Sequence, residues 1–113
     1  MVCVMVSRMP TERVEQLKSI LAQNPESTFA RYALGMEYMS TGQTDSALGE
    51  FRAVLEVDAN YANAWFMGAQ ALQQSARTPE AVQWLCDGIA CAKRAGNRHA
   101  ENQMQSMLDE LGS

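Results

Sequence analysis

The chain has 113 residues, of which 47% are hydrophobic and 19% charged, and its formal net charge is −4. This length fits one domain, and the share of apolar residues excludes a wholly disordered chain. Neither nucleic acid nor a membrane is an expected partner, because basic residues are not clustered and no run approaches the roughly 20 apolar residues of a spanning helix.

The first ten residues are apolar, but they are too short for a signal sequence and end at Pro10. Because helical periodicity begins only after this proline, residues 1–10 are expected to form a poorly ordered extension, with Met9 as the natural start. The three cysteines, Cys3, Cys86 and Cys91, are odd in number and include no CxxC pair. They are expected to be small buried hydrophobic residues in a reducing compartment, which favours a cytoplasmic location.

Apolar residues recur at helical spacing along the rest of the chain, and no segment alternates as a strand would. Asn24-Pro25 ends the first helix, because a residue before proline disfavours the α conformation. Thr11, Thr44 and Thr78 are predicted N-caps, and Gly42 is a predicted C-cap. The predicted helices span residues 11–23, 27–41, 44–57, 62–75, 78–95 and 97–111, and the last has a polar outer face that suits a capping helix.

The chain matches itself when it is shifted by 34 residues. In this register small residues fall on small ones and large residues on large ones, as they would if one packing environment recurred along the chain. The matching positions are Ala30 with Ala64, Tyr32 with Phe66, Gly35 with Ala69, Tyr38 with Leu72, Ala47 with Ala81 and Phe51 with Leu85.

These units resemble the tetratricopeptide repeat (TPR), a helix–turn–helix of 34 residues with the pattern W-x₂-L-G-x₂-Y, A-x₃-F and P. The first unit carries Leu34, Gly35 and Tyr38, followed by Ala47 and Phe51. The first unit departs from the pattern with Arg31 in the tryptophan place and Ala59 in the proline place. The second unit has Trp65, but it departs with Gly68 in the leucine place and Lys93 in the proline place.

The resemblance implies an all-α fold, namely a right-handed solenoid of antiparallel helix pairs in a single domain over residues 11–111. A half repeat at residues 11–25 would precede repeats at 28–61 and 62–95, and a capping helix at 97–111 would follow. Small residues such as Gly35 and Ala47 would let paired helices approach closely, and large ones such as Phe51 would fill the space between them.

The resemblance also implies a protein-binding module, in which the first helix of each pair lines a concave groove that holds a peptide or helix of a partner. The matching places contain no Lys or Arg, which argues against a clamp for a terminal carboxylate and favours an apolar or amphipathic ligand. For the aromatic residues and methionines, packing in the core is the alternative role. The predicted groove residues are Phe29, Tyr32, Met36, Met39, Asn63, Phe66, Met67, Gln70 and Gln73.

No catalytic residue, cofactor site or metal site is predicted. His99 is the single histidine, and the sequence has no GxGxxG, P-loop or GxSxG motif. The main alternative function is a structural subunit that forms homo-oligomers, such as a homodimer joined through the apolar residues Val2, Val4, Met5 and Val6. An enzyme with an unrecognised site and a piece of a longer repeat array are the remaining alternatives.

Overall fold

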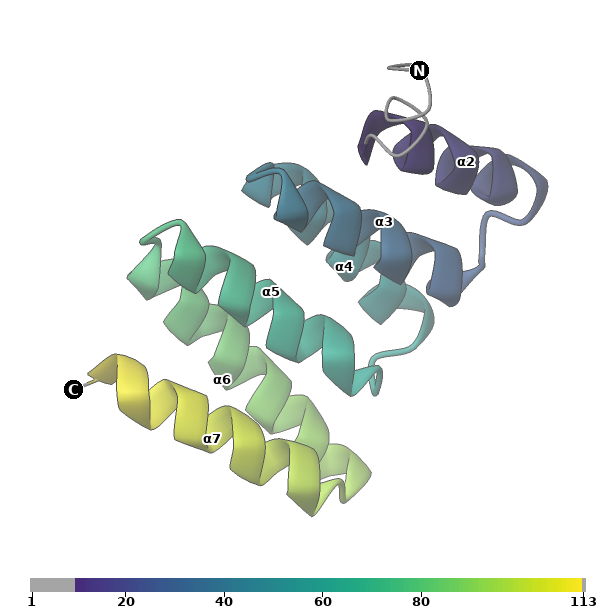
Figure 1. The fold of residues 1–113 in the computed structure, drawn as a ribbon. Coiled ribbons are helices and arrows are strands. Elements are labelled where there is room, and N and C mark those ends of the chain that lie inside the picture. The colour runs from purple at the N-terminus through teal and green to yellow at the C-terminus, as the bar shows by residue number, and fades with distance from the viewer. Residues whose placement is uncertain (1–9, 113) are drawn as a thin grey trace.

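The computed structural model describes residues 10–112, which form a stack of antiparallel α-helices without a β-strand in that range (Figure 1). Residues 1–9 of the predicted extension, with the Met9 start and the apolar residues, lie outside the described part, whereas Pro10 begins the first helix. The prediction of an all-α solenoid is confirmed. The helices are α2 (Pro10–Gln23), α3 (Thr28–Ser40), α4 (Thr44–Val57), α5 (Ala62–Gln74), α6 (Thr78–Ala95) and α7 (Arg98–Gly112).

Helices α3 and α4 form one hairpin and α5 and α6 the next, and α7 packs against α6 at the end of the stack. In Figure 1, α3, α5 and α7 lie in one layer, and α4 and α6 lie behind them. The first helices of successive hairpins therefore share one side of the molecule, and the second helices share the other.

The small residues of the repeat allow close helix packing, as predicted. A Cβ atom at Gly35 would lie 2.6 Å from a ring carbon of Phe51, so only glycine fits there without a shift of the ring. Tyr38 is only half-buried, so it fills its place less completely than its counterpart Leu72. Six other residues of the pattern are at most 1% exposed: Ala47, Phe51, Ala69, Leu72, Ala81 and Leu85.

All three predicted N-caps are wrong, because each helix begins at or before the threonine predicted to precede it. Thr11, Thr44 and Thr78 belong to α2, α4 and α6 instead of preceding them. The residues that occupy the N-cap positions of α4 and α6 are Gln43 and Arg77, and neither caps its helix with its side chain.

Both hairpin turns place one residue in the left-handed backbone conformation, at positions 34 residues apart. Gly42 has φ +76° and follows the end of α3, close to its predicted capping role, and Ala76 has φ +58° in the α5–α6 turn. In each turn the next N–H donates to the carbonyl five residues earlier at 2.9 Å, which satisfies a free carbonyl at the helix end.

Candidate binding surfaces

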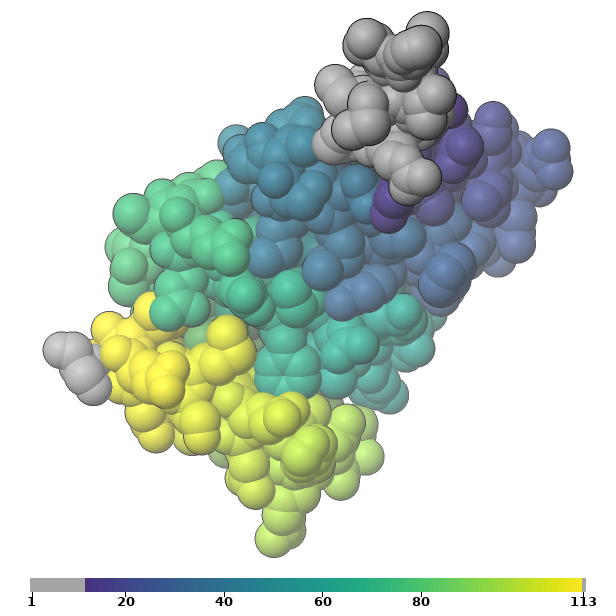
Figure 2. Space-filling model, viewed as in Figure 1, coloured from purple at the N-terminus to yellow at the C-terminus, as the bar shows by residue number. Residues whose placement is uncertain are grey.

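The predicted groove residues lie on α3 and α5, and the view in Figure 2 is of the side on which these helices and α7 lie, here called the α3–α5–α7 face. Phe29, the second residue of α3, is 72% exposed, which is unusual for a phenylalanine. Asn63, Gln70 and Gln73 are also exposed. These four side chains are accessible to a partner.

The other five predicted groove residues are half-buried and pack against the main hydrophobic core: Tyr32, Met36, Met39, Phe66 and Met67. The Tyr32 ring lies 5.7 Å from that of Phe51 and 5.5 Å from that of Tyr61, centre to centre. Burial raises the pKa of the Tyr32 hydroxyl, and the neighbouring Tyr61 adds to the effect. Tyr32 therefore combines a packing role with a partly accessible surface.

Two hollows lie beside α4, away from all nine predicted groove residues. The hollow between α4 and α6, here called the α4–α6 hollow, has a volume of about 450 Å³ and is lined by Arg52, Leu55, Glu56, Trp65, Leu72, Glu80, Gln83, Trp84 and Asp87. The hollow between α2 and α4, here called the α2–α4 hollow, has a volume of about 430 Å³ and is lined by Val14, Glu15, Lys18, Tyr38, Thr41, Gln43 and Ser46.

Two tryptophans form the centre of the α4–α6 hollow. The Trp84 indole N–H donates to the carbonyl of Trp65 at 2.8 Å, and the two rings meet edge to face with centroids 5.6 Å apart. A Cβ atom at Gly68 would lie 2.3 Å from Trp84, and one at Gly88 would lie 3.0 Å from Trp65. Each tryptophan thus packs on a glycine of the opposite helix.

Sequence reasoning missed Trp84, although a signal was present. Gly68 departs from the repeat pattern at the leucine place, and the space of the missing side chain is taken up by the Trp84 ring. At the positions equivalent to Trp65 and Trp84, the first repeat has an ion pair between Arg31 and Glu50, with the charged atoms 3.2 Å apart.

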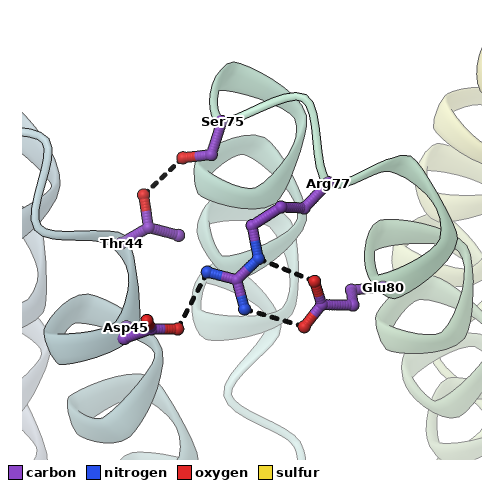
Figure 3. Close-up of polar contacts among 5 residues, drawn as sticks. All are labelled: Thr44, Asp45, Ser75, Arg77 and Glu80. Carbon is purple, nitrogen blue, oxygen red and sulfur yellow. Dashed lines mark hydrogen bonds and ion pairs between the residues drawn. The ribbon is translucent and has the colours of Figure 1, made fainter.

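Arg77 binds the lining residue Glu80 at one end of the α4–α6 hollow (Figure 3). Arg77 donates to both carboxylate oxygens of Glu80 at 2.7 Å and to Asp45 of α4 at 2.8 Å, and the hydroxyls of Thr44 and Ser75 are hydrogen-bonded beside it. These contacts hold the pKa of Glu80 below its usual value and raise that of Arg77. They also tie the two hairpins together.

Within residues 10–112, no group of three or more His, Cys, Asp or Glu side chains is placed to hold a metal ion. The prediction for Cys86 is wrong, because its side chain points outward from α6 and is exposed, whereas Cys91 is buried and its thiol donates to the carbonyl of Ala59 at 3.0 Å. In the same part of the chain, no helix has the length and apolar character needed to cross a bilayer.

No family model matches the chain. It is 28% identical to a TPR repeat-containing protein of Pseudomonas aeruginosa over 98 residues, which are 87% of this chain and 93% of that protein. A protein of Bordetella parapertussis with a known solution structure is 31% identical, with a TM-score of 0.72 and coverage of 88% and 86%. A tetratricopeptide repeat domain protein from Salinibacter ruber is 25% identical, with a TM-score of 0.67 and coverage of 78% and 89%.

The chain is a small tetratricopeptide-repeat protein. This TPR protein shares nearly the whole length of its relatives, so the likeness extends over both hairpins and the flanking helices. The TPR fold is one that serves protein–protein interaction in general, and its members are typically not enzymes.

Proposed function

We propose that this TPR protein is a non-enzymatic adaptor that binds a peptide or helix of a partner protein along the α3–α5–α7 face. The observation that carries the proposal is the exposure of Phe29 on that face, since 72% of this large apolar side chain is accessible to water. A partner that covers the ring would gain free energy, because burial of apolar surface drives association.

The residues that accompany Phe29 suit a ligand with an apolar side. Met36 and Met39 are half-buried on α3, and methionine side chains adapt their shape to different ligands. On α5, the exposed amides of Asn63 and Gln70 can donate to and accept from a peptide backbone. This combination supports an amphipathic helix or an extended peptide as the ligand.

The proposal is tested by capture of the partner from a lysate of the cells that make the protein, followed by mass spectrometry. The variant Met36→Lys with Met39→Glu places charges in the proposed groove and should abolish capture while circular dichroism shows unchanged helical content. Light scattering after chromatography separates the alternative function, because a dimer that persists on dilution would favour a homo-oligomeric structural subunit.

A second variant guards against loss of folding, since both methionines also pack against the core. Phe29→Glu with Gln70→Glu changes two exposed positions and should also abolish capture. Val57→Glu is the matched control, because Val57 is a 55% exposed apolar residue on α4, outside the proposed groove. Retained capture by the Phe29 and Gln70 variant would overturn the proposal.

A further inference from the structure

We propose that the α4–α6 hollow is a second binding surface, which takes a segment of a partner protein that carries a basic side chain next to a large apolar one. This surface is distinct from the predicted groove, since none of the nine predicted groove residues lines the hollow. The proposal rests on the shape and apolar floor of the hollow and on the charges around its rim.

The floor of the hollow is apolar and already formed. Leu72 is 1% exposed and Trp84 7% exposed, so both are held in place by the core. The hydrogen bond of the Trp84 indole and the close approach of Gly68 fix the orientation of the ring. A volume of about 450 Å³ falls within the range of ligand pockets, and a preformed pocket loses little conformational freedom on binding.

The charges at one end of the hollow are compensated within the protein. Glu80, in the first turn of α6, has both carboxylate oxygens bound by Arg77. The guanidinium carbon of Arg52 lies 5.4 Å from the centre of the Trp84 ring, so this cation is placed over the aromatic face. A basic ligand group gains little at this end.

The other end of the hollow carries carboxylates without a cationic partner. Glu56 lies in the last turn of α4, and neither it nor Asp87 forms an ion pair with another residue in the described range. Asp87 accepts one hydrogen bond, from the amide of Gln83 at 3.0 Å. The lining therefore contains three acids, Glu56, Glu80 and Asp87, against one base, Arg52, so the hollow is acidic on balance.

The repeat places Glu56 and Asp87 about one helical turn apart along the parallel helices α4 and α6. The position equivalent to Glu56 in the next repeat is residue 90, so Asp87, in the middle of α6, lies about one helical turn before the level of Glu56. The last turn of α4 has no basic residue, and the carbonyls of a helix end add negative potential. A Lys or Arg of a partner fits there, with its apolar neighbour against Leu55 and Trp65.

The α2–α4 hollow provides a natural comparison. It is of similar size, about 430 Å³, but it is lined by one acid, Glu15, and one base, Lys18. Tyr38 takes the place of Leu72, and no tryptophan lines it. A basic, apolar segment should therefore prefer the α4–α6 hollow.

The test is a nuclear magnetic resonance titration of the ¹⁵N-labelled protein with three six-residue peptides. All three alternate leucine with a second residue, which is arginine in the first, glutamine in the second and glutamate in the third. The indole N–H signals of Trp65 and Trp84 are direct reporters. The arginine peptide should shift them to saturation, with weaker binding at higher salt concentration, and the glutamate peptide should leave them unchanged.

The variant Glu56→Gln with Asp87→Asn should raise the Kd of the arginine peptide about tenfold, since two charge-assisted contacts are lost. Both residues are exposed, so the fold should be retained, and Glu15→Gln in the α2–α4 hollow should leave the Kd unchanged. Equal binding of the three peptides, an unchanged Kd in the double variant, or shifts confined to the α3–α5–α7 face would each overturn the proposal. Changes of the indole signals on simple dilution would overturn it in favour of a second copy of the chain as occupant.

Discussion

Trp84 lies directly over Gly68, so that a Cβ atom at position 68 would be 2.3 Å from two carbons of the indole ring. The equivalent positions of the first repeat hold Glu50 and Leu34. The two repeats therefore share a backbone arrangement but fill it differently. In the second repeat, the glycine on α5 is a requirement of the tryptophan on α6.

Replacement of this glycine should be destabilising. Gly68→Ala forces either the buried indole or the helix backbone to move, and overpacking of this kind lowers the free energy of unfolding by about 1–3 kcal/mol. Urea unfolding measures the change. Gly49→Ala is the matched control, because Gly49 is also inside a helix but has no atom within 4 Å of the added Cβ. The control should stabilise the protein by up to about 1 kcal/mol, and a similar gain for Gly68→Ala would refute the packing argument.

The repeat register predicted the core because positions that hold a small residue, or a large one, in both repeats occupy the same buried places in both hairpins. Ala47 and Ala81 are both 0% exposed, and so are Phe51 and Leu85. The α4–α6 hollow could not be predicted in this way. It depends on Trp84, which stands where the first repeat has Glu50, so the only sign of it in the pattern that identified the fold was the departure at Gly68.

The predicted N-caps failed for a related reason. A threonine before an apolar run is a local signal, whereas the start of α4 is set by the left-handed residue in the turn before it and by the hydrogen bond from the N–H of Gln43 to the carbonyl of Tyr38. The hydroxyl of Thr44 then bonds with Ser75 of the next hairpin. Contacts between hairpins are not visible in a sequence window of one helix.

Enlargement of a small residue between paired helices tests the repeat register itself. Ala47 is 0% exposed in the core, so Ala47→Leu should lower the free energy of unfolding by about 1–3 kcal/mol and reduce the melting temperature. Ala90→Leu adds the same side chain at an exposed position of α6 and should change stability little. Equal melting temperatures for the two variants would show that Ala47 is not confined by its neighbours.

The Arg77–Glu80 contact should be visible in the acid dependence of stability. A carboxyl whose pKa is lowered in the folded state stabilises the fold above its unfolded pKa of about 4.3, and this contribution is lost as the pH falls through the folded pKa. Arg77→Gln should therefore raise the pKa of Glu80. The difference in melting temperature between wild type and variant should shrink as the pH falls from about 6 to about 3.

Carboxyl chemical shifts followed through a pH titration measure the pKa of Glu80 directly. Arg13→Gln is the control, since it removes an arginine that lies 3.3 Å from Glu37 and has no contact with the α5–α6 turn. That variant should leave the titration of Glu80 as in wild type. If Arg77→Gln also leaves it unchanged, the two hydrogen bonds at 2.7 Å do not persist in solution.

The turns at Gly42 and Ala76 should respond in opposite directions to exchange of their residues. Both have positive φ, which costs an L-residue about 1–2 kcal/mol and glycine nothing, whereas glycine adds about 0.5–1 kcal/mol of freedom to the unfolded chain. The strain outweighs the entropy, so Ala76→Gly should stabilise the protein by about 0.5–1 kcal/mol and Gly42→Ala should destabilise it by a similar amount. Urea midpoints that move the same way in both variants would show that the two turns do not share this backbone conformation, although they occupy equivalent places in the repeat.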